Sequence, residues 1–142
     1  MNQSSHCDFS SPESVTRSFI EAMHHWEIES EQARRAARKT EDPASCQLSS
    51  REKVNEIFQF FCTQKERKYG RQGSFQSPPE YDPEKEKIIA AKEEGNLAEV
   101  ESEREAILGG GRYRYVLRKQ NGRWLIDTLK FYDLDDWKPH IL

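Results

Sequence analysis

Hydrophobic residues recur at helical spacing in two segments of the N-terminal half. The first segment begins at Ser11-Pro12, because serine is a favoured N-cap residue and proline is favoured at the first helical position. Its apolar positions form one stripe, which predicts an amphipathic helix: Val15, Phe19, Ala22, Met23 and Trp26. The stripe fades over Glu27 to Lys39, so this stretch is either a solvated continuation of the helix or a second short helix.

A further helix is predicted from Ser49 or Ser50 to Tyr69-Gly70, after a linker over residues 40–47. Ser49 and Glu52 have the spacing of a capping box, and glycine is common just beyond a helix end. The core-facing stripe of this helix is Val54, Ile57, Phe58 and Phe61. Both helices therefore have one face to bury against another layer.

Residues 82–108 carry conflicting signals. Their richness in glutamate, lysine and alanine favours a helix, but Gly95-Asn96 interrupts it. Ala98, Val100 and Ser102 alternate with glutamates, as in a half-buried strand. The residues by themselves leave helix and strand equally open here.

The clearest pattern lies near the C-terminal end. Apolar and polar residues alternate over 112–118 and again over 124–128. Asn121-Gly122 between them is a strong signal for a two-residue hairpin turn. Such a turn places Gln120 opposite Arg123, and the same register places Tyr115 opposite Thr128.

This register sorts the hairpin residues into two faces. One set is predicted to pack against the helices: Tyr113, Tyr115, Leu117, Trp124 and Ile126. The opposite face carries a mixed set, in which the arginines lie beside the aspartate: Arg114, Val116, Arg118, Leu125, Asp127, Leu129 and Phe131. Four apolar side chains on one exposed face form a patch that an isolated monomer should avoid. We therefore expect this face to contact another protein.

The length of 142 residues fits a single domain. We expect one domain over residues 1–142, organised as a disordered N-terminus (1–10), a helical part (11–70), a mainly antiparallel sheet (71–133) and a C-terminal tail (134–142). The formal net charge of -3 argues against binding nucleic acid by bulk attraction. The start of the chain is polar and shows no signal segment, and no stretch is apolar enough to span a membrane. The three cysteines lack metal-ligand spacing and fit a reducing compartment. These observations predict a cytoplasmic protein.

The sequence contains no convincing catalytic or metal site. His24 and His25 are adjacent, so they do not share a helix face, and we expect them at a helix boundary. The inward tyrosines have no acid or base predicted beside them, because the hairpin register points Asp127 outward. Cys62 follows two phenylalanines and is interpreted as a buried apolar residue. We therefore expect no enzyme activity, no cofactor and no metal.

Four segments resemble a known family when they are taken together. They are IFQFFCTQKERKYG (57–70), PPEYDPEKEKI (78–88), AEVESE (98–103) and YRYVLRKQNGRWLID (113–127). In this order, the chain resembles the bacterial immunity proteins of polymorphic toxin systems, which are built on the nuclear transport factor 2-like fold. The resemblance implies an α+β cone in which N-terminal helices pack on a curved antiparallel sheet. It also implies strands near 87–93 and 97–105, with Gly109 to Gly111 as a link to the next strand.

The function that this resemblance implies is the binding and neutralisation of a cognate toxin by occlusion of its active or substrate-binding surface. A large toxin reading frame directly upstream of the gene would settle this class of function. Two alternatives remain open: a cone-pocket enzyme or small-molecule binder of the ketosteroid isomerase-like type, and a domain that serves only for dimerisation. No nucleic-acid or membrane partner is expected.

Charge patterning supplies candidates for the toxin-binding surface. Residues 80–105 contain ten acidic and four basic residues, a balance of -6, whereas residues 106–142 contain four acidic and seven basic residues, a balance of +3. An acidic surface steers a basic partner toward binding, although such a run is also commonly just a solvated face. The candidate residues are Glu99, Glu101, Glu103, Glu93 and Glu94.

Overall fold

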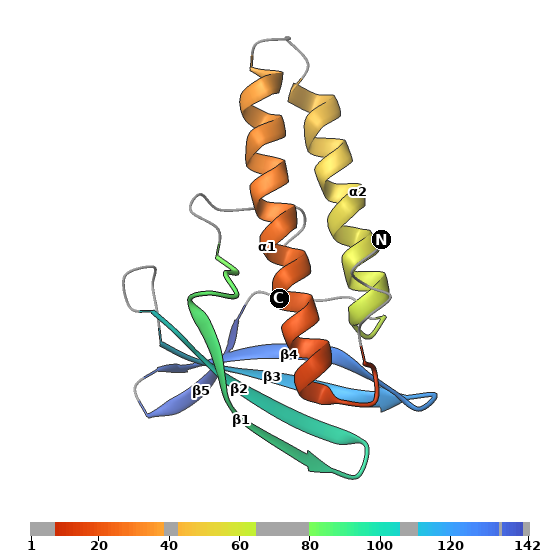
Figure 1. Cartoon of the computed structure of the whole chain (residues 1–142), viewed down its shortest axis with the longest axis vertical. Coiled ribbons are helices and arrows are strands. Elements are labelled where there is room, and N and C mark those ends of the chain that lie inside the picture. Colours follow the sequence, from red (N-terminus) through yellow and green to blue (C-terminus); the bar gives the residue numbers. More distant parts are fainter. Residues whose placement is uncertain (1–7, 39–42, 65–79, 106–110, 134, 141–142) are drawn as a thin grey trace.

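A pair of long helices stands on one face of an antiparallel sheet in this computed structural model (Figure 1). The structure describes residues 8–38, 43–64, 80–105, 111–133 and 135–140. Helix α1 spans Pro12–Ala37 and helix α2 spans Pro43–Phe61. The lower part of α1 lies across the sheet, and the upper parts of both helices project beyond it as an arm (Figure 1).

The sheet is a five-stranded meander in the order β1-β2-β3-β4-β5. Its strands are β1 (Glu86–Glu94), β2 (Leu97–Arg104), β3 (Gly111–Gln120), β4 (Arg123–Asp133) and β5 (Asp136–His140). All neighbouring strands are antiparallel. The predicted α+β architecture of helices on an antiparallel sheet is therefore confirmed.

Helix α1 begins as its sequence predicts. Pro12 is its first residue, and the Ser11 side chain accepts a hydrogen bond from the Ser14 backbone N–H at 3.3 Å. The helix continues without a break to Ala37, so the stretch after Trp26 is a solvated continuation. His24 and His25 lie in the middle of this helix, and their predicted position at a helix boundary is wrong.

Helix α2 begins six residues before the predicted start and ends before the predicted end. Pro43 opens the helix, so Ser49 lies inside it and does not cap it. After Phe61 the chain leaves the helix, and the Thr63 backbone N–H donates to the Ile126 carbonyl at 2.9 Å. This hydrogen bond covers the edge of β4 that β5 does not reach. The predicted end at Tyr69-Gly70 lies outside the described residues.

The conflicting segment forms two strands, as the family resemblance implies. β1 and β2 are joined by a turn at Gly95, which has a positive φ of 60° that glycine adopts without strain. Ala98, Val100 and Ser102 are buried, and the glutamates between them point away from the helices. Burial against α1 thus overrides the helical propensity of this segment.

A β-bulge changes the predicted register of the last hairpin. Leu117 lies opposite Ile126 as expected, but Val116 lies opposite Thr128, so Asp127 is an extra residue in β4. Tyr115 therefore pairs with Leu129 instead of Thr128. Beyond the bulge, every side chain of β4 therefore lies on the face opposite to the one predicted.

The bulge corrects three residues of the predicted outer face. Leu129 is fully buried in the core, Phe131 packs against the core, and Asp127 is also buried. The inner set is confirmed, since these residues are all buried: Tyr113, Tyr115, Leu117, Trp124 and Ile126. Only four members of the predicted outer set keep that position: Arg114, Val116, Arg118 and Leu125.

Both ends of the chain contain structure that the sequence analysis does not expect. Phe9, assigned to a disordered N-terminus, packs its ring on Phe60, and its carbonyl oxygen accepts a hydrogen bond from the backbone N–H of Trp124. Residues 136–140, assigned to a tail, form the edge strand β5. Pro139 is compatible with this strand because an edge position leaves its missing N–H without consequence.

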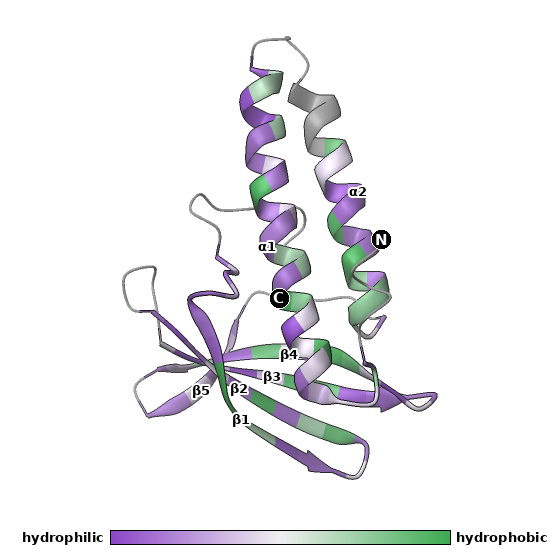
Figure 2. Ribbon diagram, viewed as in Figure 1, coloured by the Kyte–Doolittle hydropathy of each residue, from purple (hydrophilic) through white to green (hydrophobic). Residues whose placement is uncertain are grey.

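The core lies between the lower half of the helices and the inner face of the sheet. Its buried residues include Val15, Phe19, Met23, Val54, Phe61, Cys62, Trp124 and Ile126. The apolar colouring in Figure 2 follows this distribution: it is strong at the lower end of α2 and within the sheet, and weak along the upper part of α1. Among the described residues, no helix lies on the opposite face of the sheet (Figure 1).

Candidate functional site

The outer face of the sheet, defined as the side away from the helices, brings acidic and basic rows together. On β2, Glu99, Glu101 and Glu103 point outward. On the neighbouring β3, Arg112 lies opposite Glu103 and Arg114 lies opposite Glu101. The predicted glutamate row therefore exists, but it runs beside arginines that partly neutralise it.

Arg114 lies near the centre of this face and contacts both of its halves. Its guanidinium lies 3.6 Å from a Glu99 carboxylate oxygen and 3.5 Å from one of Glu101. The same guanidinium stacks over the Trp137 ring of β5, 4.1 Å from its centroid. The Tyr132 ring packs edge-on against Trp137 at 5.2 Å. One side chain thus connects the acidic row to an aromatic pair.

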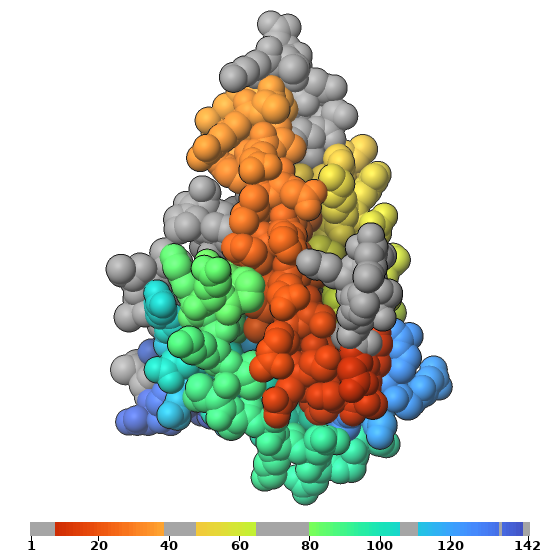
Figure 3. Space-filling model, viewed as in Figure 1, coloured from red at the N-terminus to blue at the C-terminus, as the bar shows by residue number. Residues whose placement is uncertain are grey.

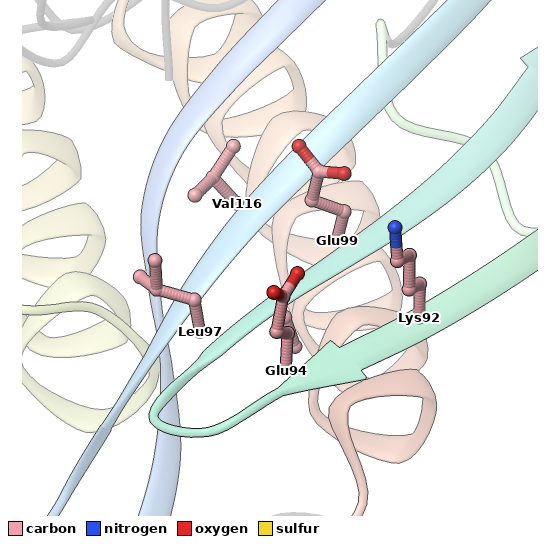
Figure 4. A pocket seen from close by; sticks show the side chains of 6 residues that line it. Lys92, Glu94, Leu97, Glu99 and Val116 are labelled. Atoms are coloured by element: carbon pink, nitrogen blue, oxygen red, sulfur yellow. The ribbon is translucent and has the colours of Figure 1, made fainter.

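A hollow of about 170 Å³ opens on the same face near the β1–β2 turn (Figure 4). Glu94 and Glu99 line it together with Lys92, and Leu97, Ala98 and Val116 supply its apolar surface. Leu97 is 45% exposed, which is unusual for a large apolar side chain. The hollow therefore combines carboxylates with apolar walls, as protein interfaces do.

The remaining acidic candidates lie at the end of the β1–β2 hairpin. Glu93 and Glu94 are both exposed. This hairpin forms the lower boundary of the molecule in the space-filling view, below the start of α1 (Figure 3). Glu94 lies opposite Leu97 and is accessible to a partner that approaches the outer face from this end, whereas Glu93 lies opposite the buried Ala98 and points to the helix side of the sheet.

Two residues of the outer set form the ion pair that the sequence analysis expects. Arg118 Nε lies 3.5 Å from Asp127 Oδ2. Asp127 Oδ1 also accepts a hydrogen bond from Thr63 Oγ1 at 2.8 Å, so its carboxylate joins the sheet to the residues after α2. Arg114 pairs with the β2 glutamates and not with Asp127 as expected.

The interior of the cone holds a buried ion network that the sequence analysis misses. Arg104 Nε donates to Glu86 at 2.9 Å, and its Nη1 donates to Glu80 at 2.9 Å. The Tyr115 hydroxyl donates to Glu86 Oε2 at 2.8 Å. An inward carboxylate therefore does lie beside an inward tyrosine, contrary to the expectation. Glu80 and Glu86 are consequently not part of the acidic surface.

The environment of this interior favours the charged form of Arg104 and the neutral form of the Tyr115 phenol. Burial raises the pKa of Tyr115 well above its ordinary value, and the adjacent Glu86 raises it further. Burial by itself would lower the pKa of Arg104, but Tyr115 and the two carboxylates hold it well above its ordinary value. Arg104 is therefore a cation at neutral pH.

Further contacts tie this network to the helix and to the last strand. Glu27 of α1 is fully buried and accepts hydrogen bonds from the backbone N–H groups of Glu80 and Tyr81. His140 Nε2 of β5 lies 3.0 Å from the same Glu80 carboxylate. His24 Nδ1 lies 2.8 Å from the Tyr81 carbonyl oxygen, which gives this histidine a structural role.

Within the described ranges, no group of three or more histidine, cysteine, aspartate or glutamate side chains is arranged to hold a metal ion. Neither helix, as far as the structure describes them, has a stretch long and apolar enough to cross a membrane. Cys62 lies in the core, and its prediction as a buried apolar residue is confirmed.

Comparison with known proteins gives two matches of nearly full length. The model of a family described as NTF2 fold immunity protein matches residues 11–140. A protein named Immunity protein RhsIA, from Dickeya dadantii (strain 3937), is 29% identical over 135 residues, which cover 92% of this chain and 95% of that protein. No solved structure shows significant similarity to the chain.

Proposed function

The chain belongs to the NTF2-fold immunity protein family and is a toxin-neutralising immunity protein, and on this basis we propose how it acts. It binds the cognate toxin through the outer face of the sheet and occludes the toxin's active or substrate-binding surface. The residues proposed to make this contact are Glu94, Glu99, Glu101, Glu103, Arg114, Val116, Arg118 and Leu125. The predicted candidate Glu93 is left out because it points to the helix side of the sheet. A second copy of the chain is the alternative occupant of the same face.

The observation that carries this proposal is the composition of the outer face. Glu99 lines the hollow, both Glu99 and Glu101 lie beside Arg114, and Glu103 is exposed further along the same strand. Leu97 and Val116 add apolar area between the charges. A toxin that acts on nucleic acid needs a basic cleft, and an acidic surface is complementary to such a cleft.

The interior of the cone supports a binding function without catalysis. In enzymes of the ketosteroid isomerase-like type, this space receives the substrate. In this chain Arg104, Glu80, Glu86 and Tyr115 occupy it and bind one another. Their hydrogen bonds are directed inward to each other, which supports neutralisation by surface binding.

We place the encounter with the toxin in the cytosol. The three cysteines of the sequence are an odd number without metal-ligand spacing, which suits a reducing compartment better than a disulfide framework. Immunity in this proposal requires no transport step, because the protein acts where it is synthesised.

Replacing Glu99, Glu101 and Glu103 together by glutamine tests the proposed surface. The probe is the isolated domain of the cognate toxin. We expect the association rate constant to fall about tenfold at low salt and the salt dependence to flatten, because opposite charges accelerate encounter. The thermal midpoint should change little, since the ion pairs to Arg114 are long and partly exposed. Stopped-flow binding at several salt concentrations measures both quantities.

A second triple variant controls for net charge. Glu29, Glu52 and Glu56 are exposed on the helices, and their replacement by glutamine removes the same three charges. This control should bind the toxin domain with nearly the parent rate. Equal rates and salt slopes for the parent and both variants would show that the acidic row is a solvated face with no part in binding.

A further inference from the structure

The β4–β5 end of the outer face carries an exposed aromatic pair that the proposed contact set does not contain. Tyr132 is 42% exposed, and Trp137 is partly exposed beside it. Their rings pack at 5.2 Å, and Arg114 stacks on Trp137 at 4.1 Å. Tryptophan, tyrosine and arginine are the residues most enriched among the energetic hot spots of protein interfaces.

The pair is also held rigidly before any partner binds. Tyr132 and Trp137 lie opposite each other in the β4–β5 ladder. On the inner face of β5, His140 contacts Glu80 and packs against the rings of Tyr113 and Phe131. Since β5 is fixed by these contacts, little conformational freedom remains to be lost when a partner covers the aromatic rings.

The size of the whole face suits a protein partner. Five strands about 4.8 Å apart and about 30 Å long present an area on the order of 700 Å². A standard interface buries roughly 800 Å² on each partner. A partner that covers β1 to β5 thus contacts the acidic row and the aromatic pair at once, with Arg114 between them.

We infer that Trp137 and Tyr132 are the anchor of the toxin interface, and that the toxin presents to them an apolar or aromatic side chain while its basic residues lie over β2. This inference rests on the proposed function. It assigns separate roles to the two regions of one surface. The acidic row governs how fast the complex forms, and the aromatic pair governs how long the complex lasts.

Trp137→Ala tests this inference with the same domain of the cognate toxin. We expect the dissociation rate constant to rise at least tenfold, with the association rate constant and its salt dependence nearly unchanged. Tyr132→Ala should raise the dissociation rate constant in the same direction by a smaller factor. Leu48→Ala is the matched control, because Leu48 is a 57% exposed apolar residue on the helical arm, and it should leave both rate constants within about twofold of the parent.

The imidazole resonances of His140 report whether β5 stays in place in each variant. If they match those of the parent and Trp137→Ala still dissociates at the parent rate, the aromatic pair is not an anchor and the inference is wrong. If Trp137→Ala displaces β5, the test passes to Tyr132→Ala. A Tyr132→Ala protein that keeps the parent His140 resonances and dissociates at the parent rate would then show that the inference is wrong. A parent protein that fails to bind the toxin domain would overturn the proposed function itself, a result distinct from loss of the anchor alone.

Discussion

Replacing Arg104 by alanine is expected to lower the free energy of unfolding by about 3 to 5 kcal/mol. The Arg104 side chain is only 7% exposed and donates to both Glu86 and Glu80. Its removal leaves two carboxylates in a space that water does not freely reach, and it removes the cation that stacks 3.9 Å from the Tyr113 ring centroid. Chemical denaturation followed by tryptophan fluorescence measures this loss.

Two further variants separate the ionic effect from a general loss of packing. Arg112→Ala removes an exposed arginine from the next strand and should change stability by less than about 0.5 kcal/mol. Glu86→Gln, introduced into the Arg104→Ala chain, should recover part of the loss because it removes one uncompensated buried charge. A stability for Arg104→Ala close to that of the parent would show that the interior is hydrated and that the cone is open.

Trp124→Ala is expected to cost about 3 to 5 kcal/mol of stability by creating a large cavity. Trp124 is 1% exposed and belongs to the same core cluster as Phe19, Met23 and Phe61. A thermal midpoint within a degree or two of the parent would place this side chain in solvent and contradict the register of the hairpin.

Trp124→Phe provides the comparison for that experiment. Within the described residues, the buried Trp124 indole N–H has no hydrogen-bond partner. Phenylalanine removes this unsatisfied donor and leaves a smaller cavity than alanine does. Its cost should therefore be well below that of Trp124→Ala, and an equal cost would mean that the indole N–H contributes to stability.

The sequence predicts the fold well where local signals and burial agree. The Asn121-Gly122 turn determines the register of the last hairpin up to Leu117 and Ile126, and alternation then identifies the inner face. The prediction fails beyond that point because Asp127 is an extra residue whose carboxylate is held by Thr63, 64 residues earlier in the chain. No local pattern marks such a bulge, so Leu129 and Phe131 were assigned to the wrong face.

Other differences arise from signals that were present but ambiguous. Asp42-Pro43 resembles Ser11-Pro12 in sequence, because each places proline directly after a residue type that is favoured at a helix N-cap. The sequence analysis nevertheless assigns this segment to a linker. Glu86 and Arg104 are opposite one another across β1 and β2, and they face inward only because α1 covers that side. Which residue of a run of glutamates and lysines points into the core depends on the residues that surround it in the folded protein.

The structure of the complex with the cognate toxin domain tests the central claim most directly. The account predicts that the toxin covers the outer face, with Glu99, Glu101 and Trp137 in contact with it and its active or substrate-binding surface closed off. A complex in which the toxin is seated against the projecting arm of α1 and α2, with the outer face open to solvent, would contradict it.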